Sequence, residues 1–533
     1  MGKKYYPTVG LEIHAELKTQ TKMFCACLNN PDEEKPNVNI CPVCMAHPGT
    51  LPVPNKKAIE NVIKVGLAIN GDIADFTEFD RKNYFYPDIP KGYQISQFKY
   101  PIVSWGHLAD FDVTRIHLEE DTANNKHRDE VIPEVRLRGD SPKSDFGLGY
   151  SLIDFNRAGV PLMELVTEPH SFESDEEAAK ASSTFAKELQ LILKYLGVSE
   201  ANMEKGEMRV EANISISENP KVLELNKPRN EVNREEIMKL LGTKVEVKNL
   251  NSFKSVERAI KFEVDRMMEL IESGKGSEIV QETRGWDESK MQTFSQRKKE
   301  GSADYRYFPD PDLPKMKLHS EFDLEKMKSE LPELPAERRN KYKTVWKHFY
   351  ELKEMNNFED IEYDKKINFL IENTIVSNYL DSIIKNMNLN IINNDFVKNL
   401  INTIINDIYP IQQKYPEIIF PGKLTAEFVP IILSLRNDGM LTNIGYKEVI
   451  EVTYKTGVHP FEYAKEHNLL QENNEGVIKT IVEKIISENA DIVAIYKSGK
   501  ENVIMSLVGK VIKESKGSAN PQLVIKMLKD LLK

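Results

Sequence analysis

The sequence predicts an α+β protein, in which a mixed α/β region with an antiparallel sheet precedes a region built of helices. Strand-like alternation of apolar and polar residues, interleaved with helical periodicity, runs from the N-terminus to about residue 295. Proline-rich segments follow, and from about residue 336 the strand signals fade into Lys-, Ile- and Asn-rich helical sequence. At roughly 150 residues per domain, a length of 533 residues allows three or four domains.

Three segments of the N-terminal region have the alternation of half-buried strands. Residues 6–18 alternate most clearly, residues 208–217 repeat the pattern, and residues 245–248 form a shorter third segment. Successive strand side chains point to opposite faces of a sheet. In the first segment one face is therefore apolar, and the other presents Glu12 and His14.

A helix is predicted between the first two of these strands. Ser174 and Glu177 have the spacing of a capping box, and Gly197 suits the C-terminal end. Residues 122–149 are polar and contain Gly and Pro, so we expect a loop insertion there.

The C-terminal half begins with a proline-rich break. Residues 304–314 and 331–335 are expected to be extended linkers. Near the end, residues 501–514 predict a helix, and Asn520-Pro521 predicts the start of a short final helix. The segment from Lys479 onward carries ten Lys against six Asp and Glu, a local net charge of +4.

Composition excludes several classes of protein. The chain is 40% hydrophobic and 29% charged, as ordinary globular proteins are, and its net charge is −11. The acidic balance argues against a DNA-coating protein but leaves room for a local RNA-binding surface. No apolar stretch approaches the length of a membrane span, and the N-terminus lacks the apolar core of a signal peptide. We therefore expect a cytoplasmic protein with no membrane or DNA partner.

All four cysteines lie in one short window. Cys25-Ala-Cys27 and Cys41-Pro-Val-Cys44 are two close pairs separated by 13 residues. Four thiolates are a complete ligand set for a tetrahedral structural zinc, and disulfides are rare in the cytosol. Zinc is the favoured interpretation, with free thiols as the alternative.

Carboxylates recur on the polar faces of the predicted strands. Glu12 and His14 share one face, and the later strands contribute Glu211 and Glu246. The segment RIHLEED at 115–121 adds an imidazole and further carboxylates, namely His117, Glu119, Glu120 and Asp121. If they converge, these groups would form a site for a hard cation, with Mg²⁺ beside a nucleotide as the best candidate.

The segment DRKNYFYPD at 80–88 combines cations with aromatic rings. Arg81 and Lys82 could hold phosphates while a neighbouring ring stacks on a base; alternatively, the rings pack into the core. The sequence contains no Walker-type phosphate loop, no dinucleotide-binding glycine motif and no serine-hydrolase elbow. Any use of ATP would therefore need an unconventional site.

Ordered motifs run through the sequence from the first strand to the C-terminus. They are VGLEIHAEL (9–17), FDRKNYFYPDIPKGYQISQF (79–98), RIHLEED (115–121), SLIDFNRAGVPLMELVTEP (151–169), MEKGEMRVEANISI (203–216), EVKNLNSF (246–253), QETRGWDE (281–288), DYRYFPDPDLP (304–314) and SLVGKVIKESKGSANPQLV (506–524). In these motifs the chain closely resembles the GatB/GatE family, whose GatB members are one of the three subunits of the heterotrimeric aspartyl/glutamyl-tRNA amidotransferase.

The resemblance implies three domains and a reaction. Residues 1–295 would form a cradle domain with the active site, 296–410 a linker and helical domain, and 411–533 a helical, tRNA-binding, YqeY-like tail. The family uses ATP to phosphorylate the side-chain carboxylate of Glu-tRNA(Gln) or Asp-tRNA(Asn). Ammonia, which the amidase subunit releases from glutamine, then displaces the phosphate to form Gln-tRNA(Gln) or Asn-tRNA(Asn). A small third subunit wraps around the other two and completes the heterotrimer.

The resemblance also implies roles for individual residues. The expected catalytic Mg²⁺ ligands are Glu12, His14, Glu120 and Glu246. Glu211, where the family usually has Asp, is a candidate for a second cation or for orienting the site. The expected nucleotide contacts are Lys82, Asn83 and Tyr84, and the expected zinc ligands are Cys25, Cys27, Cys41 and Cys44.

Three other functions compete with this one. A GatE protein would carry a large inserted domain that this chain lacks. A non-catalytic tRNA-binding module is disfavoured because the expected ligand residues are present. A self-sufficient amidase is disfavoured because the amidase signature is absent.

Overall fold

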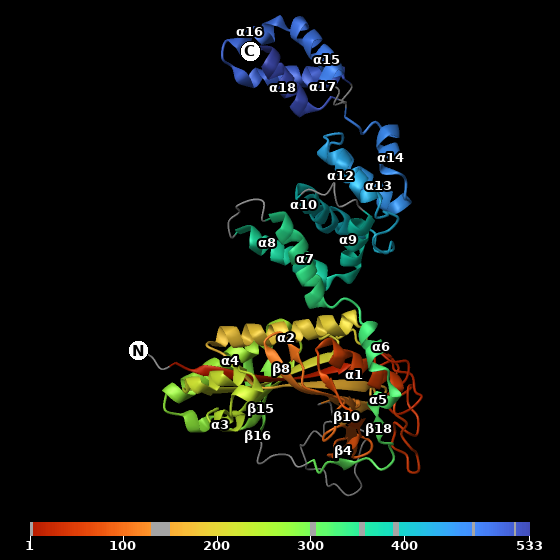
Figure 1. The fold of residues 1–533 in the computed structure, drawn as a ribbon, viewed down its shortest axis with the longest axis vertical. Coiled ribbons are helices and arrows are strands. Elements are labelled where there is room, and N and C mark those ends of the chain that lie inside the picture. Colours follow the sequence, from red (N-terminus) through yellow and green to blue (C-terminus); the bar gives the residue numbers. More distant parts are fainter. Residues whose placement is uncertain are drawn as a thin grey trace, which may run out of the picture. The chain divides into compact units, whose positions relative to one another are not determined.

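A computed structural model describes residues 4–128, 150–298, 305–350, 358–386, 394–471, 475–515 and 519–532 (Figure 1). The chain divides into two compact units, Met1–Pro335 and Ala336–Lys533. Within the described residues, all the strands belong to the first unit, and the second unit is built of helices. The order of the two fold types along the chain is the order that the sequence predicts.

The first unit is built on a large sheet, which has 11 strands within the described residues. Neighbouring strands are antiparallel, apart from β14 and β15, which are parallel. In spatial order the strands are β16 (Gln292–Lys298), β15 (Glu282–Asp287), β14 (Val245–Leu250), β13 (Met208–Ser217), β1 (Tyr6–Glu16), β11 (Pro161–Thr167), β8 (Phe111–Glu120), β6 (Val103–Ser104) and β2 (Asp72–Ile73). Two short strands flank this path: β12 (His170–Ser171) pairs with β1, and β7 (His107–Leu108) pairs with β8.

Helices cover the apolar face of this sheet. They are α1 (Lys56–Ala68), α2 (Asp175–Tyr195) and α4 (Phe253–Glu272), and Figure 1 shows α2 running along the sheet. Ile13 of β1 and Val210 of β13 are completely buried in the same core as Phe185 of α2. Burying side chains of this size contributes about 1.5–3 kcal/mol each. The helices therefore occupy one face and leave the polar side chains of these strands on the other.

The predicted caps of α2 are present. The Ser174 side chain accepts a hydrogen bond from the Glu177 backbone N–H, and Gly197 after the helix adopts a left-handed φ of 66°. Glycine enters this region without steric cost, which is why it follows so many helix ends.

Three small sheets complete the strands of the first unit. One consists of β5 (Tyr93–Ser96), β4 (Asp80–Asn83) and β17 (Phe308–Pro309), and another of β3 (Phe76–Thr77) and β18 (Met316–Lys317). The third pairs β9 (Asn124–Arg128) with β10 (Tyr150–Asp154), so the segment expected to be a loop begins with a strand. Its polar sequence lacks the alternation that reveals a half-buried strand. Residues 129–149 of that expected loop lie outside the described residues.

The first unit extends beyond the expected boundary near residue 295. The chain after that point returns to the unit, because β17 pairs with β4 and β18 pairs with β3. Three short helices also belong to it: α3 (Arg234–Met238), α5 (Leu318–Glu321) and α6 (Leu324–Ser329). The prolines that suggested a linker are compatible with short edge strands.

The second unit is helical, as the sequence predicts. Its helices are α7 (Pro335–Tyr350, which begins at the boundary), α8 (Phe358–Glu372), α9 (Thr374–Asn386), α10 (Asn394–Asn402), α11 (Tyr409–Lys414), α12 (Phe428–Asn437), α13 (Asn443–Thr456), α14 (Pro460–Glu466), α15 (Glu475–Glu488), α16 (Ala490–Lys497), α17 (Ile504–Glu514) and α18 (Pro521–Leu532). The last four share a core of their own, formed by residues between 478 and 532. A further division of this unit at residue 410 stays a prediction. Among the described helices, none is both long and apolar enough to cross a membrane.

Candidate active site

Five carboxylates and two imidazoles meet on the polar face of the large sheet. These residues form three overlapping groups, and within each group the potential ligand atoms lie within 4.8 Å of one another. The groups are His117–Glu119–Glu164, Glu12–His14–Glu164 and Glu12–Glu211–Glu246. Because they share Glu164 and Glu12, the three groups form one continuous row of potential cation ligands, which we call the carboxylate row.

The pairing of five strands creates this row. Glu164 of β11 stands opposite His14 of β1 on one side and His117 of β8 on the other. On the far side of β1, Glu12 is paired with Glu211 of β13. Glu246 extends the row on β14, where it is paired with Asn213. Residues at paired or alternate positions share one face of a sheet, so the row follows from the register of the strands.

Glu164 is the centre of the row. One of its oxygens, Oε2, lies 3.4 Å from Nε2 of both His14 and His117, and Oε1 lies 3.5 Å from Nη2 of Arg115. Burial opposes its charged form, but the two imidazoles hold the pKa of Glu164 well below its usual range. It is therefore a buried anion at neutral pH.

The remaining groups of the row are electrostatically crowded. Burial, together with the charges of Glu164 and Glu211, raises the pKa of Glu12 to about 7. Burial disfavours the charged form of His14, but its hydrogen bond to Glu164 and the nearby carboxylates raise its pKa to about 9. Like charges packed this closely are costly in a buried site. A divalent cation would relieve this repulsion, and the carboxylate oxygens, which outnumber the imidazole nitrogens, suit Mg²⁺ or Mn²⁺.

Two lysines lie at opposite ends of the row. Lys82 Nζ is 3.8 Å from Oε2 of Glu119, and Lys248 Nζ is 2.7 Å from Oε2 of Glu211. Burial opposes both charges, but Glu119 raises the pKa of Lys82, and Glu211 with Glu246 raises that of Lys248. Both ammonium groups stay charged and can bind an anionic substrate beside the carboxylates.

Glu120 does not join the row. It follows Glu119 in β8, so its side chain points to the other face of the strand. There its Oε1 accepts a hydrogen bond from the Ile95 N–H (2.9 Å) and pairs with Lys91 Nζ (2.5 Å). At the position where the resemblance led us to expect Glu120, the structure places Glu119.

The other two expected nucleotide contacts lie next to Lys82. The Tyr84 hydroxyl donates a hydrogen bond to Oε1 of Gln94 (3.0 Å), and burial raises the pKa of Tyr84. The Asn83 amide donates to the backbone oxygens of Tyr305 (3.1 Å) and Arg306 (2.9 Å). The Asn83 side chain therefore holds the chain near residue 305.

The four cysteines come together as a second candidate site. All four sulfur atoms lie within 4.8 Å of one another, and those of Cys41 and Cys44 are 3.8 Å apart. Zinc–sulfur bonds of about 2.3 Å in a tetrahedron would place sulfurs about 3.8 Å apart. A hydrogen bond with Cys25, aided by the Cys41 N–H and by Lys22, lowers the pKa of Cys44 below its usual range. The cysteines form no disulfide, and their arrangement suits a structural metal.

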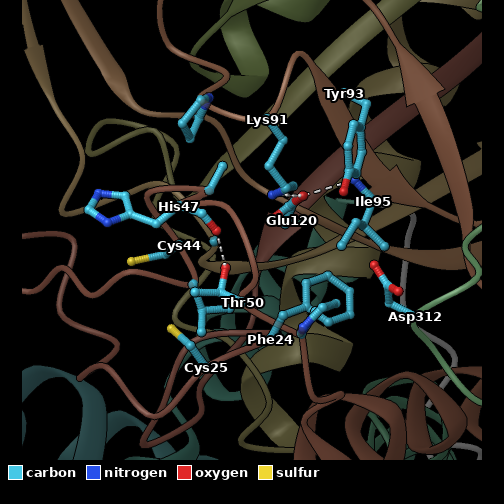
Figure 2. A pocket seen from close by; sticks show the side chains of 15 residues that line it. Phe24, Cys25, Cys44, His47, Thr50, Lys91, Tyr93, Ile95, Glu120 and Asp312 are labelled. Carbon is cyan, nitrogen blue, oxygen red and sulfur yellow. Dashed lines mark hydrogen bonds and ion pairs between the residues drawn. The ribbon is translucent and has the colours of Figure 1, made fainter.

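A cavity of about 190 Å³ separates this cluster from Glu120. Figure 2 shows Cys25 and Cys44 on one side, and the Lys91–Glu120 pair with Tyr93 and Ile95 on the other. Glu119 and Glu120 thus serve two different environments, one on each face of β8.

Sequence reasoning missed Glu164 and did not rank Glu119 above Glu120. Glu164 interrupts an otherwise apolar strand, PLMELVT at 161–167, and such an isolated carboxylate is an available signal. Strand alternation would also have separated Glu119 from Glu120, because His117 and Glu119 share a face.

The chain is similar to known proteins along nearly its whole length. Residues 7–323 match the family model described as the GatB/GatE catalytic domain, and residues 414–532 match the model of the GatB domain. The GatB subunit of the aspartyl/glutamyl-tRNA(Asn/Gln) amidotransferase of Thermotoga neapolitana is 37% identical over 537 residues, covering 99% of each chain. The corresponding proteins of Thermosipho melanesiensis and Persephonella marina are 38% and 36% identical, and the matches cover 99% of this chain and 99% and 100% of theirs.

The fold and the carboxylate row define an α+β protein with an acidic face on its large sheet. With these matches along nearly its whole length, the chain belongs to the GatB family of tRNA amidotransferase subunits.

Proposed function

We propose that this protein is the component of a tRNA-dependent amidotransferase that activates and amidates the misacylated amino acid. It uses ATP to phosphorylate the side-chain carboxylate of Glu-tRNA(Gln), Asp-tRNA(Asn) or both, and ammonia then displaces the phosphate. A carboxylate needs this activation because oxide is a poor leaving group, whereas phosphate is a good one. The observation that best supports the proposal is the carboxylate row, which lies within the residues that match the catalytic domain.

The carboxylate row would hold Mg²⁺. Glu12, His14 and Glu246 were expected ligands, and Glu164 and Glu119 join them as candidates in place of Glu120. Glu211 remains a candidate for a second cation or for orienting Lys248. When bound, the cation would neutralise charge on the transferring phosphoryl group.

Side chains around the row would bind and orient the two anionic substrates. Lys82 and Lys248 stay charged at its two ends and can each contact a phosphate or the amino-acid carboxylate. Tyr84, two residues after Lys82 in the chain, would contact the nucleotide, while Asn83 supports the nearby chain through its hydrogen bond to the Arg306 oxygen. Fixed charges of this kind accelerate phosphoryl transfer mainly by positioning and electrostatic stabilisation.

The reaction needs partners, because the relatives are named as subunits of a larger enzyme. We propose that an amidase subunit supplies ammonia from glutamine and that a small third subunit completes a heterotrimer. The cysteine cluster would bind one structural zinc. The cytoplasmic location expected from the sequence remains a prediction.

A reconstitution assay tests the proposed function. The purified complex would receive ATP, Mg²⁺, glutamine or ammonium, and each misacylated tRNA in turn, and the attached amino acid would be identified after deacylation. We expect Gln or Asn on at least one tRNA, with phosphate release that depends on that tRNA. Conversion without ATP, or by this protein alone with glutamine, would contradict the proposal.

A pair of neighbouring variants tests whether Glu119 or Glu120 belongs to the proposed ligand set. Glu119→Gln should lower tRNA-dependent phosphate release about 10²-fold or more, because it removes a charge from the row. Glu120→Gln makes the same chemical change on the other face of β8 and should lower that rate much less. The two variants are compared by their initial rates of phosphate release at saturating ATP and tRNA. An equal loss in both variants, or a larger one in Glu120→Gln, would restore Glu120 as the ligand.

The helices after residue 474 should serve tRNA binding. Because α15 to α18 share a core of their own, a chain ending at Gln471 removes them together and leaves no broken core. We expect the KM for tRNA to rise about tenfold, and the salt dependence of binding to become shallower, because phosphate contacts are lost. Equilibrium tRNA binding at two salt concentrations measures both. Unchanged affinity would refute the assignment, whereas the thermal stability of the first unit serves as the control.

A further inference from the structure

Residues 305–314, which we call the strap, lie directly against the strand that carries Lys82. Phe308 and Pro309 of the strap pair with Arg81 and Asp80 of β4. Further backbone hydrogen bonds run from the Asn83 N–H to the Tyr305 oxygen (3.0 Å) and from the Asp310 N–H to the Phe79 oxygen (2.8 Å). The strap is therefore the third strand of the small sheet and fixes β4 along its full length.

A buried ion pair anchors the strap. Arg81 Nε lies 2.8 Å from Oδ2 of Asp310, whose side chain is completely buried, and Arg81 Nη2 lies 3.0 Å from Oδ2 of Asp312. Removing one partner of a buried pair is strongly destabilising, because the other charge is left uncompensated. Arg81 and Lys82 are consecutive in β4, so they point to opposite faces. The anchor on one face thereby fixes the backbone from which Lys82 projects on the other.

On the Lys82 face, the strap supplies an aromatic wall. Lys82 Nζ is 5.4 Å from the ring centre of Tyr305, a distance at which a cation and a ring attract each other. The Tyr305 ring packs edge-on against the rings of Tyr84 and Tyr307, with ring centres 5.8 Å and 6.1 Å apart. Tyr307 in turn stacks on Phe98, with ring centres 4.4 Å apart. The ammonium group of Lys82 is thus held between the Tyr305 ring and the Glu119 carboxylate.

We propose that the strap positions Lys82 for the phosphates of the nucleotide, with Tyr305 and Asp310 as positioning residues. Asp310 locks the strap to β4 through Arg81, and the Tyr305 ring limits the directions that the flexible Lys82 side chain can take. This inference rests on the proposed function, since it assumes that Lys82 binds ATP. It adds residues that act by positioning Lys82, and these come from β17 and its flanks, which are distant from β4 in the sequence.

The test uses full-length complexes that carry Tyr305→Leu, Tyr305→Phe or, as a control, Phe294→Leu. Losing the ring at 305 should raise the KM for ATP about tenfold and change kcat less than about twofold, since a cation–π contact in a desolvated site has this strength. Tyr305→Phe keeps the ring and should stay close to the wild-type KM. Phe294→Leu also removes an aromatic ring, at an exposed position of β16 outside the strap, and should leave the KM unchanged. A merely structural role would lower thermal stability without this separation of KM from kcat.

Combination with Lys82→Met distinguishes the possible failures. If Lys82→Met raises the KM and Tyr305→Leu adds nothing further in that background, both the nucleotide role and the strap's positioning role are supported. An equal effect of Tyr305→Leu in both backgrounds, or no effect in wild type, overturns the positioning role alone. An unchanged KM in Lys82→Met overturns the nucleotide contact and, with it, this inference. Asp310→Asn gives a second route to the same answer, because its KM effect should also vanish in the Lys82→Met background.

Discussion

Replacing His14 with Ala should nearly abolish ATP-dependent activation of the misacylated tRNA. His14 lies at the centre of the carboxylate row, within 3.4 Å of Glu164 and 3.7 Å of Glu119. Its loss removes a cation ligand and increases the electrostatic repulsion between the surrounding carboxylates. Loss of a metal ligand costs several kcal/mol of transition-state stabilisation, which corresponds to roughly 10²–10⁴ in rate. The measurement is phosphate release that depends on the misacylated tRNA.

The fold should survive this change, because His14 is on the polar face of β1 while Ile13 and Ala15 fill the core. His107→Ala, at an exposed position of β7, is the matched control and should keep the wild-type rate. Supplying ammonium directly should not rescue His14→Ala, since activation precedes the attack of ammonia. A wild-type rate in His14→Ala would show that activation occurs elsewhere in the complex.

The second large effect concerns the cysteine cluster. We expect one zinc per chain, and Cys41→Ser should release it and lower the melting temperature of the first unit by several degrees. A metal present at about 1,000 times its Kd stabilises a fold by about 4 kcal/mol. Elemental analysis after dialysis measures the zinc content, and a thermal unfolding scan measures the melting temperature.

The four thiolates should act as a unit. A second substitution, Cys25→Ser, should then cost little beyond Cys41→Ser, because the metal has already been lost. A closed four-thiolate site has no open position, so kcat should change less than stability does. Zinc content near zero in reduced wild-type protein, or fully additive losses of stability, would instead favour the free-thiol alternative.

What the sequence could predict was local. The strands β1, β13 and β14 and the capped helix α2 are where the pattern placed them, because alternation and caps depend on neighbouring residues. The cysteine cluster was also foreseen, because its four ligands lie within one short window.

The features that were missed depend on contacts distant in the sequence. Glu164 faces His14 only through the register of β11 against β1, two strands that lie far apart in the chain. The strap beside Lys82 was expected to be a linker, because its prolines disfavour a strand prediction. It nevertheless contains the edge strand β17, whose partner β4 is distant in the sequence. Likewise, the hairpin of β9 and β10 is polar along most of its length and has no apolar alternation to reveal it.

Glu119 and Glu120 face different surroundings on the two sides of β8, and this restricts how the strand can change during evolution. Glu119 and Glu120 have opposite surroundings only because a strand reverses its facing direction at every residue. Deleting one residue upstream in β8 would move Glu120 into the position of Glu119 and turn Glu119 to the opposite face. Deleting two would restore the facing but slide every group by about 7 Å, which is further than a ligand set tolerates. We therefore expect related proteins to vary in the loops at either end of β8 while the length of the strand between them stays constant.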